Sequence, residues 1–389
     1  MNKTLILVLI VFSQFFGTSL WFSTNAILSS LARVHQLDSQ NLLANLTIAT
    51  QLGFIVGSLL YAFLGLADRF FANIVFSISI VLAALANASI LIPNLNFPLV
   101  FLFRLLTGFF LAGVYPVGMK IAAYFFPKSV SSALGVLVGA LVLGTSFSHF
   151  TMSFDIKLTW EAVIYSSSGL AVLGGILILF LKTPPKENIQ TMKINTLPLL
   201  FKKKKFKTAT FAYYGHMWEL YTFWTFIPLL ITTYKANQDS LLNSNLLTFM
   251  IISIGALGCV LVGKIAVKKD LTKITKIALM TSGICCLLCP LSFYFPTYIF
   301  VPYLMIWGIS FVADSPLLST LINDTCDPNH NGTGLTISTS IGFFTTIISL
   351  YLFNILLNTM PIQYVFTCLA LGPFLSVYFL SHNNSDPIV

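Results

Sequence analysis

The sequence predicts an all-α integral membrane protein whose twelve transmembrane helices form two six-helix bundles related by pseudo-two-fold symmetry. Composition is the first observation behind this prediction: of the 389 residues, 57% are hydrophobic and only 8% are charged. Soluble globular proteins average about 25% charged residues, so the chain belongs in a bilayer. The second observation is an internal repeat, because landmarks of the first half recur in the second half at an offset of about 200 residues.

The apolar residues lie in runs that are long enough to cross a bilayer as helices. A helix rising about 1.5 Å per residue needs roughly 20 residues to cross a hydrocarbon core of about 30 Å. Continuous apolar runs predict helices rather than barrel strands, which alternate polar and apolar residues. The predicted helices span residues 4–31, 41–66, 72–91, 98–123, 129–152, 160–181, 208–233, 243–267, 273–293, 297–324, 332–356 and 361–381. The first run is longer than the apolar part of a secretory signal, about 7–15 residues, so we interpret it as the first helix.

The internal repeat predicts two halves with the same helix order. Residues 104–116 (RLLTGFFLAGVYP) align with residues 304–316 (LMIWGISFVADSP), so that a glycine and a proline coincide in both halves. One long lysine-rich loop separates six helices from six. We therefore expect an N-terminal bundle over 1–181, a basic linker over 182–207 and a C-terminal bundle over 208–389, related as parallel repeats.

Basic residues indicate the orientation. Most of the 21 Lys and Arg residues fall in loops on the side of the two termini, and the positive-inside rule makes that side cytoplasmic. The net charge of +9 is thereby explained without a nucleic-acid partner, and the Lys202–Lys205 run is expected to lie on the anionic inner leaflet. We expect a monomeric multi-pass protein of a bacterial inner (cytoplasmic) membrane.

Enzymatic chemistry is not indicated by the sequence. The six cysteines fall mostly inside apolar helices, where thiols pack as small hydrophobic groups, and no His or carboxylate accompanies them at metal-ligand spacing. No G-x-x-x-x-G-K-[ST] loop is present to bind ATP, and no nucleophile and base stand together. We expect no enzyme activity, no metal and no cofactor.

The loop after the second helix carries a motif, Leu66-Ala67-Asp68-Arg69. With Arg104 and Gly108 in the R-x-x-x-G pattern of the fourth helix, it makes nearly the whole chain resemble the major facilitator superfamily. The resemblance implies that Asp68 and Arg69 belong to a cytoplasmic gate, although Leu64 and Phe71 replace glycines of the family motif. An alternative is that the acidic and basic pair only marks a tight turn.

Two further comparisons bear on the branch of that family. The fifth helix lacks the Gly-Pro pair of drug/proton antiporters, which argues against a multidrug exporter. The segments 214–221 (YGHMWELY) in the seventh helix and 313–316 (ADSP) in the tenth helix, which contain His216, Glu219 and Asp314, resemble those of uncharacterised bacterial relatives of the anion and cyanate-type permeases. This resemblance assigns no substrate.

Three ionisable side chains stand inside apolar helices, and each must face a partner or a water-filled cavity because burying a charge in a bilayer is costly. Glu219 lies near the middle of the seventh helix, with His216 one turn earlier on the same face. We hypothesise that Glu219, assisted by His216, carries a coupling proton; the alternative is a fixed hydrogen-bonded strut. Asp314 could be a second proton site, a sodium ligand or a counter-ion. Arg104 could bind an anionic substrate or pair with an acid.

A stripe of polar and aromatic residues predicts the substrate cavity. In the first helix, Gln14, Thr18, Trp21 and Asn25 share one helical face, and at an offset of 200 the seventh helix presents Tyr214, Trp218, Tyr221 and Thr225. The family resemblance implies that the first, fourth, seventh and tenth helices line a central cavity. The substrate-cavity candidates are Gln14, Thr18, Trp21, Asn25, Arg104, Tyr115, Tyr214, Trp218, Tyr221, Thr225 and Trp307.

Together these features predict a secondary active transporter of a small solute that works by alternating access and is driven by protons, with sodium as the alternative ion. Symport is the expected form of coupling. The mixed buried charges leave anions, zwitterions and cations open as solutes, and Arg104 opposite Glu219 and Asp314 favours a small organic anion or amino-acid-like solute. Two other functions remain open at this point: a ligand sensor that kept the fold and lost transport, and a drug or metabolite efflux pump.

Overall fold

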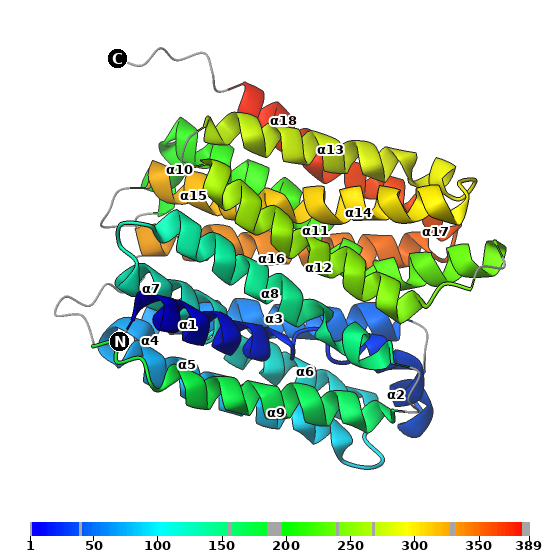
Figure 1. The fold of residues 1–389 in the computed structure, drawn as a ribbon, viewed down its shortest axis with the longest axis horizontal. Helices are drawn as coiled ribbons and strands as arrows, with labels where there is room; N and C mark the ends of the chain where they lie inside the picture. Colours follow the sequence, from blue (N-terminus) through cyan, green and yellow to red (C-terminus); the bar gives the residue numbers. More distant parts are fainter. Residues whose placement is uncertain are drawn as a thin grey trace. The chain divides into compact units, whose positions relative to one another are not determined.

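The computed structural model describes residues 2–38, 41–154, 158–184, 197–238, 241–266, 269–326 and 331–382, and these ranges contain helices and no strands. The helices in Figure 1 belong to two compact units. The first contains Met1–Ile189 and Leu242–Ser253, and the second contains Gln190–Leu241 and Ile254–Val389. Most of the predicted linker, 185–196, lies outside the described residues.

The first unit holds helices from the first half of the chain. Its helices are α1 (Lys3–Thr18), η1 (Asn25–Ile27), α2 (Leu28–Val34), α3 (Leu42–Leu64), α4 (Leu66–Arg69), α5 (Ala72–Ala88), η2 (Ser89–Leu91), α6 (Phe97–Leu111), α7 (Tyr115–Phe125), α8 (Val130–Met152) and α9 (Trp160–Ile178). Within it, α3 packs along α6, α5 along α9, and α1 against both α8 and α9.

The second unit is built mainly around one long helix, α11. Its helices are α10 (Leu197–Lys202), α11 (Lys204–Asn237), α12 (Ser244–Ala266, whose first residues belong to the first unit), α13 (Leu271–Ser292), α14 (Thr297–Ala313), α15 (Ser315–Thr325), α16 (Asn331–Leu356), α17 (Ile362–Val365), η4 (Phe366–Ala370) and α18 (Leu371–Ser381). Helices α16, α18 and α15 pack against α11, and α13 packs against α14 and α18.

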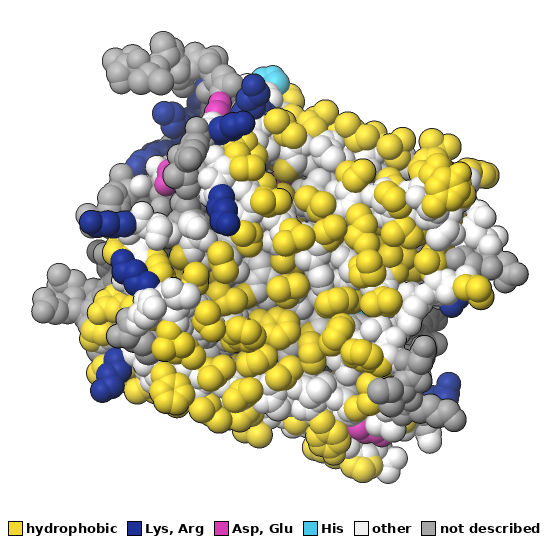
Figure 2. All heavy atoms as spheres, in the orientation of Figure 1, with side chains coloured by type: hydrophobic (Ala, Val, Ile, Leu, Met, Phe, Trp, Pro, Cys, Tyr) yellow, Lys and Arg dark blue, Asp and Glu magenta, His cyan; other side chains and the backbone are white. Residues whose placement is uncertain are grey.

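The predicted fold class is confirmed. Ten helical segments within the described ranges are long and apolar enough to cross a membrane. The shorter apolar helix α1 and the 34-residue helix α11 stand where the first and seventh spans were predicted. Apolar side chains such as Ile176, Tyr165 and Leu257 are exposed along these helices, as expected for groups that face lipid. Figure 2 shows this apolar surface, with Lys and Arg gathered toward the helix ends.

Within the described residues, three predicted helices contain non-helical residues in their interior, which the hydropathy pattern did not show. The fourth span breaks between α6 and α7 at Ala112–Val114, and the tenth breaks between α14 and α15 at Asp314. Each second piece begins with a proline near its first position, Pro116 or Pro316, and a proline lacks the N–H that would continue the preceding helix. The first span breaks at Ser19–Thr24, which follow α1 as turns.

Glycines allow the closest helix contact in the first unit. A Cβ on Gly108 would lie 1.9 Å from the carbonyl oxygen of Thr50, and a Cβ on Gly53 would lie 1.9 Å from that of Leu105. The backbones of α3 and α6 therefore touch, which is the packing that small residues permit between membrane helices.

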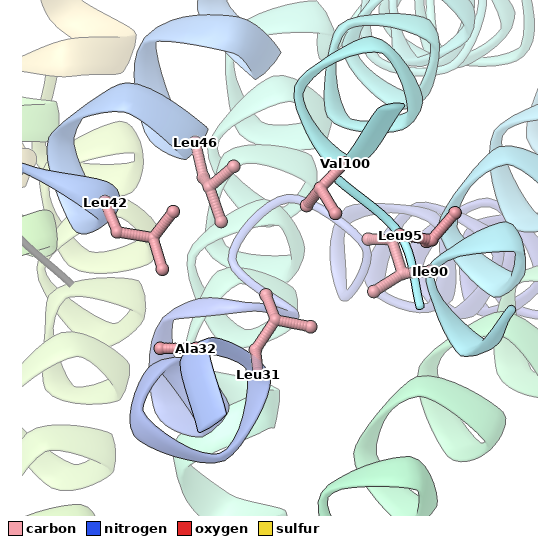
Figure 3. Packing of buried hydrophobic residues seen from close by; sticks show 7 residues of the cluster. All are labelled: Leu31, Ala32, Leu42, Leu46, Ile90, Leu95 and Val100. Carbon is pink, nitrogen blue, oxygen red and sulfur yellow. The ribbon is translucent and has the colours of Figure 1, made fainter. Parts of the chain in front are cut away.

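Buried hydrophobic residues of α2, α3, η2, α6 and the loop before α6 pack together as one cluster in the first unit. It contains Leu31, Ala32, Leu42, Leu46, Ile90, Leu95 and Val100 (Figure 3). The buried ring of His35 joins this cluster through polar contacts: the backbone N–H of Leu95 donates to Nδ1 at 3.2 Å, so Nε2 carries the hydrogen and donates to the carbonyl of Ile90 at 3.2 Å.

Candidate functional site

Glu219 is the centre of a buried polar site in the second unit. Its side chain projects from α11, and the residue is 1% exposed. Oε1 accepts a hydrogen bond from Nε1 of Trp307 on α14 at 2.9 Å. The same oxygen accepts from the hydroxyl of Ser282 and from the thiol of Cys286, the latter at 3.3 Å, both on α13. One carboxyl oxygen thus connects three helices.

His216 is paired with the other acid. Its Nδ1 lies 2.9 Å from Oδ1 of Asp314, and both residues are 1% exposed. The two atoms are within ion-pair distance, although the angles do not make a hydrogen bond, and Nε2 has no hydrogen bond among the described residues. The sequence predicted that His216 assists Glu219, whereas the structure gives it Asp314 as its ion-pair partner.

The helix break explains how Asp314 reaches His216. Asp314 is the single residue between α14 and α15, and its carbonyl accepts from the backbone N–H of Leu318 at 2.9 Å. Because α15 packs against α11, a residue at this junction lies beside the seventh predicted span. Asp314 and Glu219 therefore occupy one polar region of the second unit, to which α11, α13 and α14 contribute.

Trp307 is held by aromatic neighbours. Its ring centroid lies 4.7 Å from that of Phe223, 5.6 Å from that of Phe366 and 5.8 Å from that of Tyr303. The residue is fully buried, so its indole N–H is fixed toward Glu219. The predicted cavity residue Trp307 is thus in direct contact with the predicted coupling residue.

The predicted aromatic stripe on α11 meets several different neighbours. The indole of Trp218 donates to the carbonyl of Cys368 in η4 at 3.2 Å, while the ring of Tyr221 packs 5.1 Å from that of Phe343 on α16. Thr225 is buried and donates to the carbonyl of Tyr221. Tyr214 is partly buried, and its hydroxyl has no hydrogen bond among the described residues.

Arg104 binds the interrupted part of the first span. One guanidinium nitrogen donates to the carbonyl of Leu20 and the hydroxyl of Ser23, each at 3.1 Å, and to Oδ1 of Asn87 at 3.2 Å. The other terminal nitrogen donates to the carbonyl of Trp21. The chain beyond the C-terminal end of α1 offers carbonyls that no helix uses, and such groups attract a cation. No carboxylate is among the recorded partners of Arg104 within the described residues.

The other candidates of the first span pack between helices of the first unit. Oε1 of Gln14 lies beside Gly118 of α7, and the hydroxyl of Thr18 lies beside Gly144 of α8. The ring of Trp21 packs 4.9 Å from that of Phe54, and Asn25 begins η1 beyond the break. The helical spacing that linked these four residues ends at Thr18. Tyr115, a partly buried residue, begins α7.

The predicted gate residues lie in the short helix α4. Oδ1 of Asp68 accepts a hydrogen bond from Nζ of Lys120 on α7 at a distance of 2.5 Å. The same ammonium group also donates to the carbonyl of Ala67. Arg69 is exposed. Gly65, at φ 60°, supplies the left-handed turn between α3 and α4, a conformation that favours glycine.

Sequence reasoning missed Lys120, Ser282 and Cys286 as members of these sites. Lys120 lies near the end of a predicted span, where the positive-inside pattern explains a lysine by its effect on orientation alone. A signal was present, since a lysine inside the apolar segment 98–123 needs an acidic or carbonyl partner. Ser282 and Cys286 gave no comparable signal, because small weakly polar residues are common in membrane helices.

Comparison with known proteins supports the family resemblance. The sequence profile of the Major Facilitator Superfamily matches residues 7–380. The solved nucleoside transporter NupG has a TM-score of 0.72 at 16% identity, over 97% of this chain and 100% of that chain. The human organic anion transporter MFSD10 (TETRAN) has a TM-score of 0.74 at 14% identity, over 98% and 100%. The proton:xylose symporter XylE has a TM-score of 0.76 at 13% identity, over 98% and 95%.

No protein with a curated description matches the sequence significantly. The three structural likenesses, all at low identity, show the fold alone, whereas the profile covers nearly the whole chain and identifies the family. With its apolar helices and the Asp68 motif, this multi-pass membrane protein belongs to the major facilitator superfamily.

Proposed function

We propose that this chain is a secondary active transporter of a small solute, driven by a proton gradient, with Glu219 as the coupling residue. The observation that carries the proposal is the environment of Glu219. The carboxyl group is 1% exposed, and its three recorded hydrogen-bond donors, from Ser282, Cys286 and Trp307, are neutral groups. A buried acid held by neutral donors gains or loses a full charge when it exchanges a proton, and such acids mark ion pathways in membrane proteins.

Asp314 and Glu219 are proposed to have different roles. Asp314 already has a titratable partner in His216, so a proton can be shared within that pair without a change in its total charge. We propose that the Asp314–His216 pair holds the break between α14 and α15 against α11. The proton that is exchanged during transport belongs to Glu219. Sodium remains the alternative driving ion, with carboxylate oxygens as its ligands.

Alternating access is the mechanism proposed for the fold, in which two halves expose a site to each side in turn. The termini are placed in the cytoplasm by the positive-inside rule, in a bacterial inner membrane. Because both terminal nitrogens of Arg104 are bound by oxygens of the first unit, the preference for an anionic solute rests on donors such as its Nε, which has no hydrogen bond among the described residues. The structural neighbours suggest nucleosides, pentoses and organic anions as the first solutes to test.

The test begins with finding a ligand. Purified protein is screened by thermal shift against nucleosides, pentoses, hexoses, amino acids and small organic anions, because a ligand that binds the folded state raises its apparent stability. Each ligand found is then added outside proteoliposomes that contain a pH-sensitive dye. We expect solute addition to acidify the lumen, and we expect Glu219→Gln to abolish this proton flux while ligand exchange between equal solute pools persists.

The alternatives give different outcomes in the same vesicles. A ligand sensor binds its solute and moves neither solute nor protons. Sodium coupling gives uptake that requires external sodium and leaves the dye signal flat. Efflux coupled by exchange gives alkalinisation of the lumen when solute enters from the outside. Full proton-driven accumulation by Glu219→Gln would remove the coupling role from this residue.

A further inference from the structure

We propose that Ser282, Cys286 and Trp307 form a donor cradle that transmits the charge of Glu219 to the packing of α13 and α14 against α11. These three are positioning residues, and the inference rests on the proposed proton-coupling function of Glu219. All three donate to the same oxygen, Oε1, and all three are at most 1% exposed. The cradle therefore connects one titratable atom of α11 to two other helices.

The physical basis is the strength of a hydrogen bond to an ionised acceptor. A bond that involves a charged group is roughly twice as strong as a bond between neutral groups. When Glu219 is ionised, the three bonds draw α13 and α14 toward α11. When Glu219 binds a proton, all three bonds weaken together, because they share one acceptor. The proton thus changes the contact among three helices in one step.

The donors of the cradle approach Oε1 of Glu219 from two helices. Ser282 and Cys286 lie four residues apart on α13 and so occupy one helical face. Trp307 approaches from α14, where its ring is fixed by Phe223 and Phe366 at 4.7 and 5.6 Å. A fixed indole cannot follow a displaced carboxyl group, so movement of Glu219 breaks this bond rather than bending it.

Other titratable groups near Glu219 come from the same region. Helix α13 contributes Cys285, Cys286 and Cys289, and α14 contributes Tyr303, whose hydroxyl donates to the carbonyl of Cys285 at 2.7 Å. Asp314, at the junction of α14 and α15, is paired with His216, which lies one helical turn from Glu219 on α11. The segments of α16 and α18 that pack against α11 carry no Asp, Glu, Lys, Arg or His. The neutral donors of the cradle therefore stabilise the charge of Glu219, and among the described residues the Asp314–His216 pair is the nearest ion pair that involves the same helix.

The residues at the corresponding positions of the first half do not form an equivalent cradle. At the offset of 200 residues, Glu219 corresponds to Ser19, Trp307 to Thr107, and Ser282 to Leu82. Ser19, the counterpart of Glu219, lies where the first span breaks, and Arg104 binds this break through the carbonyls of Leu20 and Trp21. Among the described residues, the buried carboxyl group with three neutral donors therefore belongs to the C-terminal half.

The test measures protonation of Glu219 without any substrate. The infrared carbonyl band of a protonated carboxyl group is followed against pH in purified protein, and the part that Glu219→Gln lacks is assigned to Glu219. Because the donors favour the ionised carboxylate, Ser282→Ala is expected to move the midpoint of this titration to higher pH by about one unit, a tenfold change in proton affinity. Cys286→Ala should move it in the same direction by less, since a thiol is a weak donor.

Two variants serve as controls. Ser282→Thr keeps a hydroxyl and should restore the wild-type midpoint. Ser292→Ala removes a buried hydroxyl from the same helix, one that donates to the carbonyl of Cys289, and should leave the midpoint unchanged. Equal midpoints for Ser282→Ala and Ser292→Ala would overturn the cradle, whatever their stability.

The packing half of the inference has its own readout. Tryptophan emission of the wild type should change with pH through the same midpoint as the infrared band, and the change should vanish in both Trp307→Phe and Glu219→Gln. Emission that follows pH equally in Glu219→Gln would overturn the link to Trp307. Shifted midpoints in a protein without proton flux would refute the proposed function and retain the cradle; proton flux with unshifted midpoints would do the reverse.

Discussion

Nζ of Lys120 donates a hydrogen bond to Oδ1 of Asp68 at a distance of 2.5 Å and so connects α7 to the short helix α4. The first half of the chain alone carries this pair, because Val267 and Thr320 occupy the corresponding positions 199 and 200 residues later. The family resemblance placed a gate at Asp68, and the structure adds its partner.

We predict that Lys120→Met and Asp68→Asn change the transport rate by similar factors, and that the double variant does no more than either single one. The side chains are 29% and 16% exposed, so the loss of stability should stay within about 1 kcal/mol. Initial rates of solute uptake in proteoliposomes provide the measurement. Lys128→Met, at an exposed lysine beyond α7, is the control. Additive effects of the two substitutions would contradict a shared latch.

Arg104→Met should destabilise the protein. The substitution leaves the carbonyls of Leu20 and Trp21 and the side chain of Asn87 without this donor in a buried region, which costs at least about 2 kcal/mol. Arg104→Lys keeps the charge but lacks the planar fork that reaches several acceptors, so it should recover only part of the stability.

Thermal unfolding in detergent measures this effect. Arg33→Met, at an exposed arginine at the end of α2, is the control and should unfold at the wild-type temperature. If Arg104→Met unfolds normally and loses only solute binding, Arg104 is a substrate ligand and not the residue that holds the break in the first span.

Gly108→Ala should prevent normal packing of α3 and α6. Its Cβ would stand 1.9 Å from a backbone oxygen of Thr50, which cannot move aside as a flexible side chain could. Gly169→Ala is the matched substitution, since a Cβ at this glycine on α9 meets nothing within 4 Å. Alanine is the better helix former by about 1 kcal/mol, so Gly169→Ala should be neutral or slightly stabilising. The yield of monodisperse protein and its unfolding temperature distinguish the two variants.

His216→Leu and Asp314→Leu should be strongly coupled. Removing one member of a buried pair leaves the other without its partner, which costs about 3–5 kcal/mol, whereas replacing both by apolar residues is less harmful. The double variant should therefore be more stable than the sum of the two losses predicts. His149→Leu combined with Asp314→Leu provides the control, because His149 contacts Asn245 and belongs to the first unit. That combination should be additive within about 0.5 kcal/mol.

Residue order alone determined the positions of the membrane helices and the family. Hydropathy is a property of each segment, and a bilayer of fixed thickness converts the length of an apolar run into a span. The recurrence of Gly108 and Pro116 at Gly308 and Pro316 likewise needs no structure to be seen. What the pattern could not show is that the same prolines mark helix breaks, because a helix with a proline can continue when its neighbours satisfy the backbone.

Tertiary structure alone decided the partners of the buried polar groups. Spacing along α11 placed His216 and Glu219 on one face, yet His216 is paired with Asp314 and Glu219 is bound by Ser282, Cys286 and Trp307. The sequence allowed Arg104 to pair with an acid, whereas in the structure it donates hydrogen bonds to the carbonyls of Leu20 and Trp21, where the first span is interrupted. The reason is geometric: periodicity fixes which residues share a face of one helix, but the rotation of each helix and the places where helices break determine what that face meets.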